Sequence, residues 1–100
     1  MKQYEVIFSD AAESDFDNIL HYIAESDARR AIGFVQELRR RATEFLATAP
    51  NATSTIGRFR YFVVRRYVLV YEVDEEANTV RVVMITEGHR DWRRMIEDLS

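Results

Sequence analysis

Three strand-like runs follow one another in residues 57–92, GRFRYFVVRRYVLVYEVDEEANTVRVVMITEGHRDW. Each run is rich in β-branched and aromatic residues, and short polar segments separate the runs, as is typical of antiparallel strands joined by hairpins. The runs predict strands at Arg58–Val64, Tyr67–Val73 and Thr79–Thr86, with Asp74–Asn78 as a hairpin loop. The middle run is apolar on both faces, so we expect it to be the central strand.

The residues before these runs predict a strand and two helices. Tyr4–Phe8 is typical of a short strand, and Asp10 is expected to cap the following helix, with Glu13 completing a capping box. Ser26 and Asp27 are expected to cap the second helix. Apolar residues recur at helical spacing in both segments, which indicates that each helix has one buried face. These residues are Ala12, Phe16, Ile19, Leu20 and Ile23, then Ala31, Val35, Leu38, Ala42 and Phe45.

The predicted order of elements is β-α-α-β-β-β-α, an α+β fold with a helical hairpin packed on an antiparallel sheet. The polar residues 50–57 are expected to form a loop, and a short last helix is expected to begin at Thr86 or Asp91. Gly33 in the second helix costs about 1 kcal/mol relative to Ala. Either a close approach of the first helix offsets that cost, or the glycine is a tolerated defect. The length of 100 residues predicts one domain, residues 1–100.

Composition excludes several classes of protein. The chain has no cysteine and two histidines far apart in sequence, so we expect no disulfide, no metal centre and no cofactor. The sequence patterns of serine hydrolases, P-loop enzymes and dinucleotide-binding enzymes do not occur. No signal peptide or membrane-spanning run is evident, so we expect a cytoplasmic protein that does not bind a membrane.

The net charge of −3 and the pI of about 5.4, taken alone, disfavour anionic partners. The charge is unevenly distributed, however: residues 1–27 carry −6, residues 28–66 carry +7 and residues 67–100 carry −4. Thirteen of the fourteen basic residues are arginine, whose planar guanidinium group binds phosphate and carboxylate in a bidentate way. An anionic partner should therefore bind locally, at arginine clusters in the middle of the chain.

Arg39–Arg41 on the second helix are expected to form a solvated face with pairs such as Glu37–Arg41. Arg58 and Arg60 alternate with aromatic residues, so both guanidinium groups are expected to leave one face of their strand. That face is either an ordinary polar surface or, with Arg65 and Arg66, a surface that binds phosphate or an acidic peptide.

A second candidate constellation follows the last predicted strand, in GHRDWRR, residues 88–94. His89 and the neighbouring arginines are residue types that transfer protons and stabilise phosphate charge. The same residues also fit a simple helix start, with His89 exposed. Trp92 is expected to lie in the core or on a docking surface.

In the order and spacing of these segments, nearly the whole chain resembles the RelE/ParE superfamily of toxins from type II toxin–antitoxin systems. Residues 9–25, SDAAESDFDNILHYIAE, are similar to the family's first-helix pattern A-x-x-D-L-x-x-I-x-x-Y-I. Residues 57–92 are similar to its meander pattern R…Y-x-I-x-Y…V-x-I-x-x-I-x-H-x-R-D. The resemblance implies one of two activities. RelE-like members cleave mRNA in the ribosomal A site, and ParE-like members inhibit DNA gyrase. Both are neutralised by an antitoxin whose C-terminal segment wraps the toxin.

The resemblance also carries individual residues. Arg58 and Arg60 fall near two strand lysines of RelE-like enzymes, and Arg90 matches the arginine after the last strand. Val68 and Ile96 stand where a catalytic arginine and tyrosine are expected. Aliphatic side chains neither transfer protons nor bind an oxyanion, so the resemblance favours the ParE-like branch, without cleavage chemistry.

These inferences predict a growth-inhibiting toxin, associated with plasmid stabilisation, that binds gyrase and a cognate antitoxin in a hetero-oligomer. An antitoxin helix or strand is expected to fill a groove whose arginines face an acidic segment. The predicted contact residues are Arg58, Arg60, Arg65, Arg66, Arg90 and Trp92. One alternative is a ribosome-dependent mRNA endonuclease that uses Arg58, Arg60, His89 and Arg90 as catalytic residues, with Tyr67 and His89 replacing the lost groups. Another is a degenerate, non-toxic member that only binds a partner.

Overall fold

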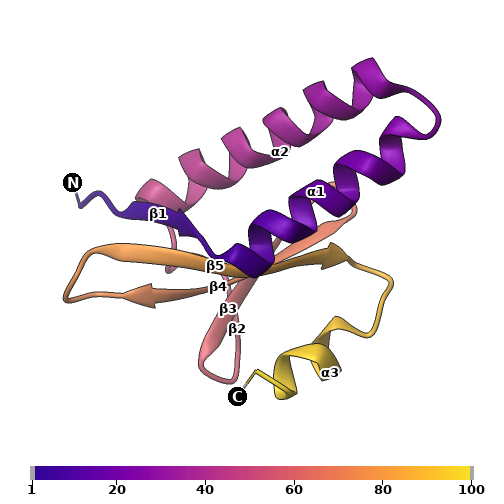
Figure 1. Cartoon of the computed structure of the whole chain (residues 1–100). Coiled ribbons are helices and arrows are strands. Elements are labelled where there is room, and N and C mark those ends of the chain that lie inside the picture. Colours follow the sequence, from indigo (N-terminus) through magenta and orange to yellow (C-terminus); the bar gives the residue numbers. More distant parts are fainter. Residues whose placement is uncertain (1, 100) are drawn as a thin grey trace.

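A computed structural model describes residues 2–99 as a five-stranded sheet with helices on both faces (Figure 1). The helical hairpin covers one face and the short last helix covers the other, so the predicted α+β architecture is confirmed. The elements are β1 Glu5–Phe8, α1 Asp10–Ala24, α2 Ala28–Thr48, β2 Ser54–Ile56, β3 Phe59–Val64, β4 Tyr67–Asp74, β5 Thr79–Glu87 and α3 Trp92–Glu97.

The strand order is β1-β5-β4-β3-β2, and it adds two features to the prediction. Residues 54–56, expected to be loop, form the edge strand β2, which pairs with β3 from Ser54↔Tyr61 to Ile56↔Phe59. The backbone of Gly57 has φ +58°, a conformation that favours glycine in the tight turn between these strands. At the other edge, β1 pairs with β5 in parallel, so the sheet is antiparallel everywhere except there.

The cap of α1 lies one residue before the predicted position. The hydroxyl of Ser9, not the carboxylate of Asp10, accepts the backbone N–H three residues later at 3.1 Å. The capping-box prediction is wrong for the same reason, since Glu13 pairs instead with Arg39 of α2. The cap of α2 is Asp27, as predicted, and its carboxylate accepts a backbone N–H at 3.0 Å.

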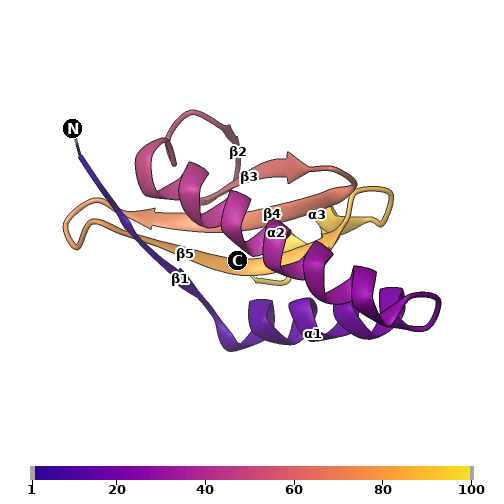
Figure 2. The same ribbon diagram turned by 90° about the horizontal axis from the view of Figure 1, so that it is seen from above.

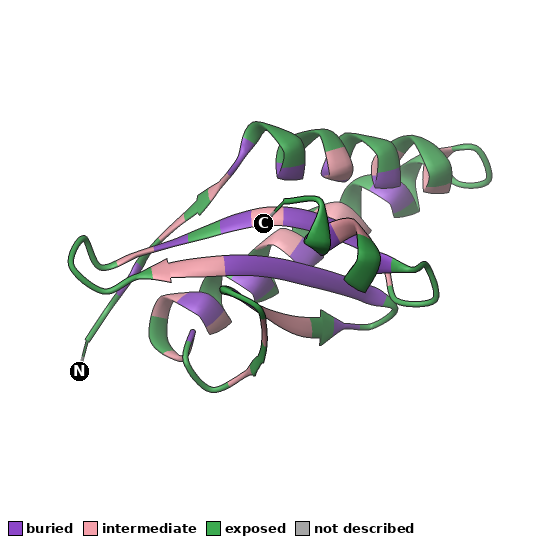
Figure 3. Ribbon diagram, turned by 90° about the horizontal axis from the view of Figure 1, so that it is seen from below, coloured by how far each residue is buried: buried purple, intermediate pink, exposed green. Residues whose placement is uncertain are grey.

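Two apolar clusters lie on opposite faces of the sheet, and β4 contributes to both. Residues 67–71 of β4 are all buried (Figure 3), which confirms β4 as the central strand. The cluster under the helical hairpin includes Phe16, Leu38, Leu46, Leu69 and Tyr71. The cluster under α3 includes Phe59, Val68, Val70, Trp92 and Ile96.

Gly33 is exposed on α2, and a Cβ atom built there would meet nothing within 4 Å. The predicted alternative of a close approach by the first helix is therefore wrong, and the glycine is a tolerated defect in the helix.

Tyr71 fixes the connection between α2 and β2. Its side chain is fully buried, and its hydroxyl donates to the carbonyl oxygen of Pro50 at 2.6 Å and bonds the hydroxyl of Thr53. Arg60 donates to the carbonyl oxygen of Thr53 at 2.7 Å. These bonds hold residues 50–53 on the side of the sheet that faces the helical hairpin. No helix among the described residues is long and apolar enough to cross a membrane.

Candidate functional site

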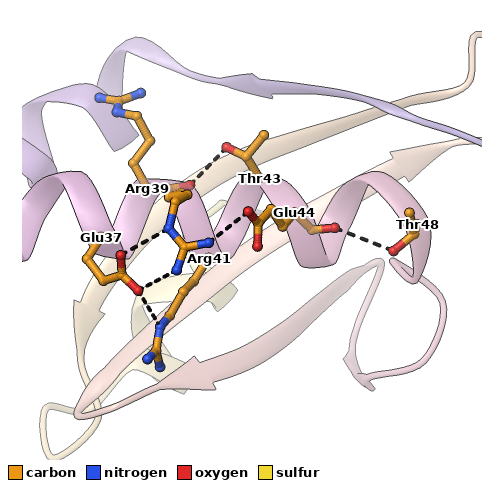
Figure 4. Close-up of polar contacts among 7 residues, drawn as sticks. Glu37, Arg39, Arg41, Thr43, Glu44 and Thr48 are labelled. Carbon is orange, nitrogen blue, oxygen red and sulfur yellow. Dashed lines mark hydrogen bonds and ion pairs between the residues drawn. The ribbon is translucent and has the colours of Figure 1, made fainter.

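The arginines in the middle of α2 are neutralised by neighbouring carboxylates (Figure 4). Arg40 pairs with Glu37 at 2.6 Å and Glu44 at 2.7 Å, and Arg41 pairs with Glu37 at 3.0 Å. Hydrogen bonds from Arg40 and Arg41 lower the pKa of Glu37 to about 2. The guanidinium group of Arg39 lies over two aromatic rings, at 4.9 and 4.4 Å from their centroids. The predicted solvated, paired face is therefore confirmed.

Arg58 and Arg60 do not share a face. Phe59 and Tyr61 share the face that packs on α3, whereas Arg60 points toward the helical hairpin, where it is half-buried and donates to a loop carbonyl. Arg58 precedes β3, lies 4.6 Å from the ring centroid of Phe59 and pairs with Glu72 at 3.4 Å. The predicted common arginine face is wrong because Arg58 lies outside the strand and because helices cover both faces of the sheet.

Four other arginines gather at one end of the molecule. Among the described residues, Arg30, Arg65, Arg66 and Arg90 form no ion pair. A hollow of about 590 Å³ is lined by Arg30, Arg65 and Arg66, and one of about 170 Å³ is lined by Arg90. Tyr22 and Tyr67 line both hollows, so the two are adjacent. We call the surface formed by these four arginines and two tyrosines the arginine groove.

Three turns that meet at one end of the fold position the arginine groove. The α1–α2, β3–β4 and β5–α3 turns all lie at this end (Figure 2). Arg65 has φ +57° in the two-residue turn between β3 and β4, and its guanidinium group lies 5.8 Å from the ring centroid of Phe34 on α2. The N–H of Gly88 donates to the carbonyl oxygen of Arg66 at 2.7 Å, which ties the β5–α3 turn to this hairpin. The segment that carries Arg90 is thereby held beside Arg66.

Beneath Arg90, Asp15 links α1 to the end of β5. Its carboxylate accepts the backbone N–H of Ile85 at 2.9 Å. Burial raises the pKa of Asp15 above its usual value, and the Ile85 N–H and the Arg90 charge offset only part of that rise. Thr86 lines the same hollow, and its hydroxyl is buried and has no hydrogen-bond partner among the described residues.

The proton-transfer groups near the arginine groove are poorly suited to act as bases. Burial, followed by the charge of Glu87, raises the pKa of Tyr67, so its hydroxyl keeps its proton at neutral pH. His89 is exposed, with 74% of its side chain accessible, and its Nε2 lies 2.9 Å from a carboxylate oxygen of Glu87. An exposed histidine does not have the desolvated, fixed surroundings that tune a general base.

Among the predicted site residues, Arg65, Arg66 and Arg90 line two adjacent hollows, and His89 precedes Arg90 in the chain. Arg60 lies four residues before Val64, the last residue of β3, which is roughly 13 Å along an extended strand. Trp92 is 5% exposed and packs on Tyr61 with a centroid distance of 4.7 Å, so it is a core residue and not a surface contact.

Sequence reasoning missed Tyr22, Arg30 and Asp15, which reach the site from the helices. Only the tertiary packing of the helical hairpin brings them against the β3–β4 turn and β5. The sequence offered one signal for Tyr22, an aromatic residue outside the apolar stripe of its helix. In the structure its side chain is 63% exposed. The positions where RelE-like catalytic groups were expected, Val68 and Ile96, are each 2% exposed and belong to the cluster under α3.

Comparison with known proteins assigns the chain to a family. Residues 6–92 match the family described as the ParE toxin of the type II toxin-antitoxin system, parDE. No curated protein matches the chain. The fold is similar to the chromosomal ParDE toxin–antitoxin system from P. aeruginosa, with TM-score 0.72 and 16% identity over 85% of this chain and 96% of that one.

Two RelE-type structures share the fold as well. A chain of the RelBE2 toxin–antitoxin complex from Mycobacterium tuberculosis has TM-score 0.67 and 18% identity, over 87% of this chain and 93% of that one. A free mutant of the E. coli toxin RelE has TM-score 0.67 and 16% identity, over 98% of this chain and 99% of that one. At such identities the structures establish the fold alone, whereas the family match covers most of the sequence. The chain belongs to the ParE toxin family of type II toxin–antitoxin systems, within the RelE/ParE superfamily.

Proposed function

We propose that this toxin inhibits growth by binding DNA gyrase, without cleavage chemistry of its own, and that the arginine groove is the contact surface. The observation that carries the proposal is the dispersal of the candidate catalytic residues. Arg58 and Arg60 bond other groups away from the turn that carries His89 and Arg90. A cleavage site needs its acid, base and charge-stabilising groups within reach of one phosphate.

The charge of the arginine groove supports binding to an acidic surface. In residues 2–99, its four arginines form no ion pair, in contrast to the paired arginines of α2. Exposed Tyr22 lies among them and supplies apolar contact area, a combination enriched in protein interfaces. A protein partner with clustered carboxylates would form ion pairs with these arginines.

The same surface also suits neutralisation by an antitoxin. The solved relatives include complexes described as toxin–antitoxin complexes, which supports a hetero-oligomer for this chain as well. An acidic antitoxin segment laid in the arginine groove would mask the charges that contact the target.

Ribosome-dependent mRNA cleavage is a second candidate, favoured by the gathering of Arg66, Tyr67 and Arg90 at one end. The raised pKa of Tyr67 weighs against it, because a tyrosine that holds its proton is a poor base. Under this alternative, the wild-type protein cuts mRNA on the ribosome, and Arg90→Ala abolishes the cleavage.

A supercoiling assay with paired arginine variants tests the proposal. Arg66→Ala removes an arginine of the groove, and Arg94→Ala removes an exposed arginine that pairs with Asp91 outside it. We expect Arg66→Ala to weaken gyrase inhibition by about tenfold or more, the usual effect of losing an interface arginine worth over 1.4 kcal/mol. Arg94→Ala should inhibit like the wild type. Equal inhibition by both variants would contradict the assignment of the groove.

A further inference from the structure

We propose that the outer edge of β3 at Val63 receives an extended, acidic peptide segment as an additional strand of the sheet. This site adjoins the arginine groove at Arg65, which lines both, and it does not depend on the choice between gyrase and ribosome as target. It follows from an unpaired stretch of strand, a hollow along that stretch, and the charges beside it.

The second half of β3 has a free edge. β2 pairs with β3 only as far as Tyr61, where Ser54 is the last partner. The chain before Ser54 then turns toward Tyr71, which bonds Pro50 and Thr53 on the helical-hairpin side. Within residues 2–99, therefore, no strand pairs with the outer edge of β3 beyond Tyr61.

The backbone of Val63 faces this free edge. A two-residue turn joins Val64 to Tyr67, so these two residues form a hydrogen-bonded pair of the β3–β4 ladder. Hydrogen bonding alternates along an antiparallel strand, so the N–H and C=O of Val63 point away from β4. The N–H and C=O of Tyr61, two residues earlier, point to the same side, where β2 lies. An unpaired donor and acceptor on an exposed strand edge form a template for strand addition.

A hollow of about 600 Å³ runs along this edge and contains no carboxylate. Phe45 and Phe62 provide its apolar wall, and Val63 is 56% exposed at its rim. Arg65, which lies over Phe34 and forms no ion pair among the described residues, places a cation on the helical-hairpin side. Arg41 on α2 lines the same side, and its Nε pairs with Glu37 on α2 at 3.0 Å. Charge complementarity therefore selects an acidic guest over a basic one.

Strand alternation also predicts the pattern of the guest. Val63 points to the α3 side of the sheet, the side on which Tyr61 lies. The guest residue opposite Val63 should be apolar, and its two neighbours, on the side of Arg41 and Arg65, should be acidic. A second copy of this chain is a poor guest, because pairing two β3 edges would bring two arginine-lined hollows together.

Selection from a library of short extended peptides tests this proposal on the full chain. We expect the wild type to enrich peptides with an acidic–apolar–acidic pattern. Val63→Pro removes the outward N–H without touching the β4 ladder, and should weaken binding of an enriched peptide at least tenfold. Thr55→Pro makes the same change on the outer edge of β2, away from the hollow, and should leave binding unchanged.

Charge reversal gives a second test that does not depend on tolerance of proline. Arg41→Glu with Arg65→Glu should shift the preference from acidic to basic peptides. The proposal is overturned if no acidic pattern is enriched, if Val63→Pro and the wild type bind an enriched peptide equally, or if the reversed protein still prefers acidic peptides. It is also overturned if the wild type self-associates through this edge and Val63→Pro abolishes the association.

Discussion

Removing the Asp15 side chain tests how α1 is held against β5 beneath Arg90. Asp15 accepts the N–H of Ile85, a residue that is 3% exposed. Asp15→Ala leaves this buried donor without a partner, which costs about 1–3 kcal/mol. For a chain of this size, Tm should fall by roughly 4–8 °C for each kcal/mol.

Asp15→Asn separates the hydrogen bond from the charge. The amide oxygen still accepts the Ile85 N–H, while the half-buried charge and its attraction to Arg90 are both removed. Because burial is the largest influence on the Asp15 pKa, the two losses offset each other, and we expect a change within about 1 kcal/mol. Asp17→Asn, on the exposed side of α1, is the matched control and should leave stability unchanged.

The pH dependence has a definite sign. Folding raises the pKa of Asp15, so the folded state binds this proton more tightly than the unfolded state. Relative to Asp15→Asn, the wild type should therefore gain stability as the pH falls through the folded pKa of Asp15, and the gain should be absent above it. Urea unfolding followed by circular dichroism at several pH values measures both effects. Wild-type stability in Asp15→Ala, or equal losses in Asp15→Ala and Asp15→Asn, would refute this reasoning.

Three further outcomes follow from the packing and charges. Gly33→Ala should raise the free energy of unfolding by about 1 kcal/mol in urea, because the site is open and helical; a loss of stability would contradict this. Val68→Arg should unfold the chain, because it buries an unpaired charge in the core. The cooperative thermal transition should be lost. A folded variant that cleaves mRNA would contradict the assignment of Val68 to the core. Hydrogen bonds from Lys2, Asn51 and Tyr4 lower the pKa of Glu75 to about 2. The stabilisation from these bonds is therefore present above the unfolded pKa and is lost as the pH falls toward 2. Glu75→Gln should flatten this part of the plot of stability against pH, and an unchanged plot would count against the network.

Most of the fold could be predicted because local patterns and tertiary packing agree. The three runs of residues 57–92 have strand composition, and the apolar stripe of each helix is the face that packs on the sheet. β2 escaped prediction because residues 54–56 form an edge strand, with two of three side chains exposed, so no apolar alternation marks them. The cap of α1 was misplaced because Ser9 and Asp10 are adjacent and both are favoured at that position.

The candidate site was predictable where its residues share one turn region. Arg65, Arg66 and Arg90 are all carried by turns that follow strands, and strand pairing brings those turns together. Arg30 lies on a helix, and only the packing of the helical hairpin places it there. Arg58 was misassigned because the alternation rule applies within a strand, and β3 begins one residue later.

Purified wild-type toxin, measured side by side for gyrase supercoiling and for ribosome-dependent mRNA cleavage, tests the central claim most directly. We predict that gyrase is inhibited, that the cognate antitoxin relieves the inhibition, and that mRNA on the ribosome stays intact. Codon-dependent cuts in mRNA with unaffected supercoiling would contradict the claim.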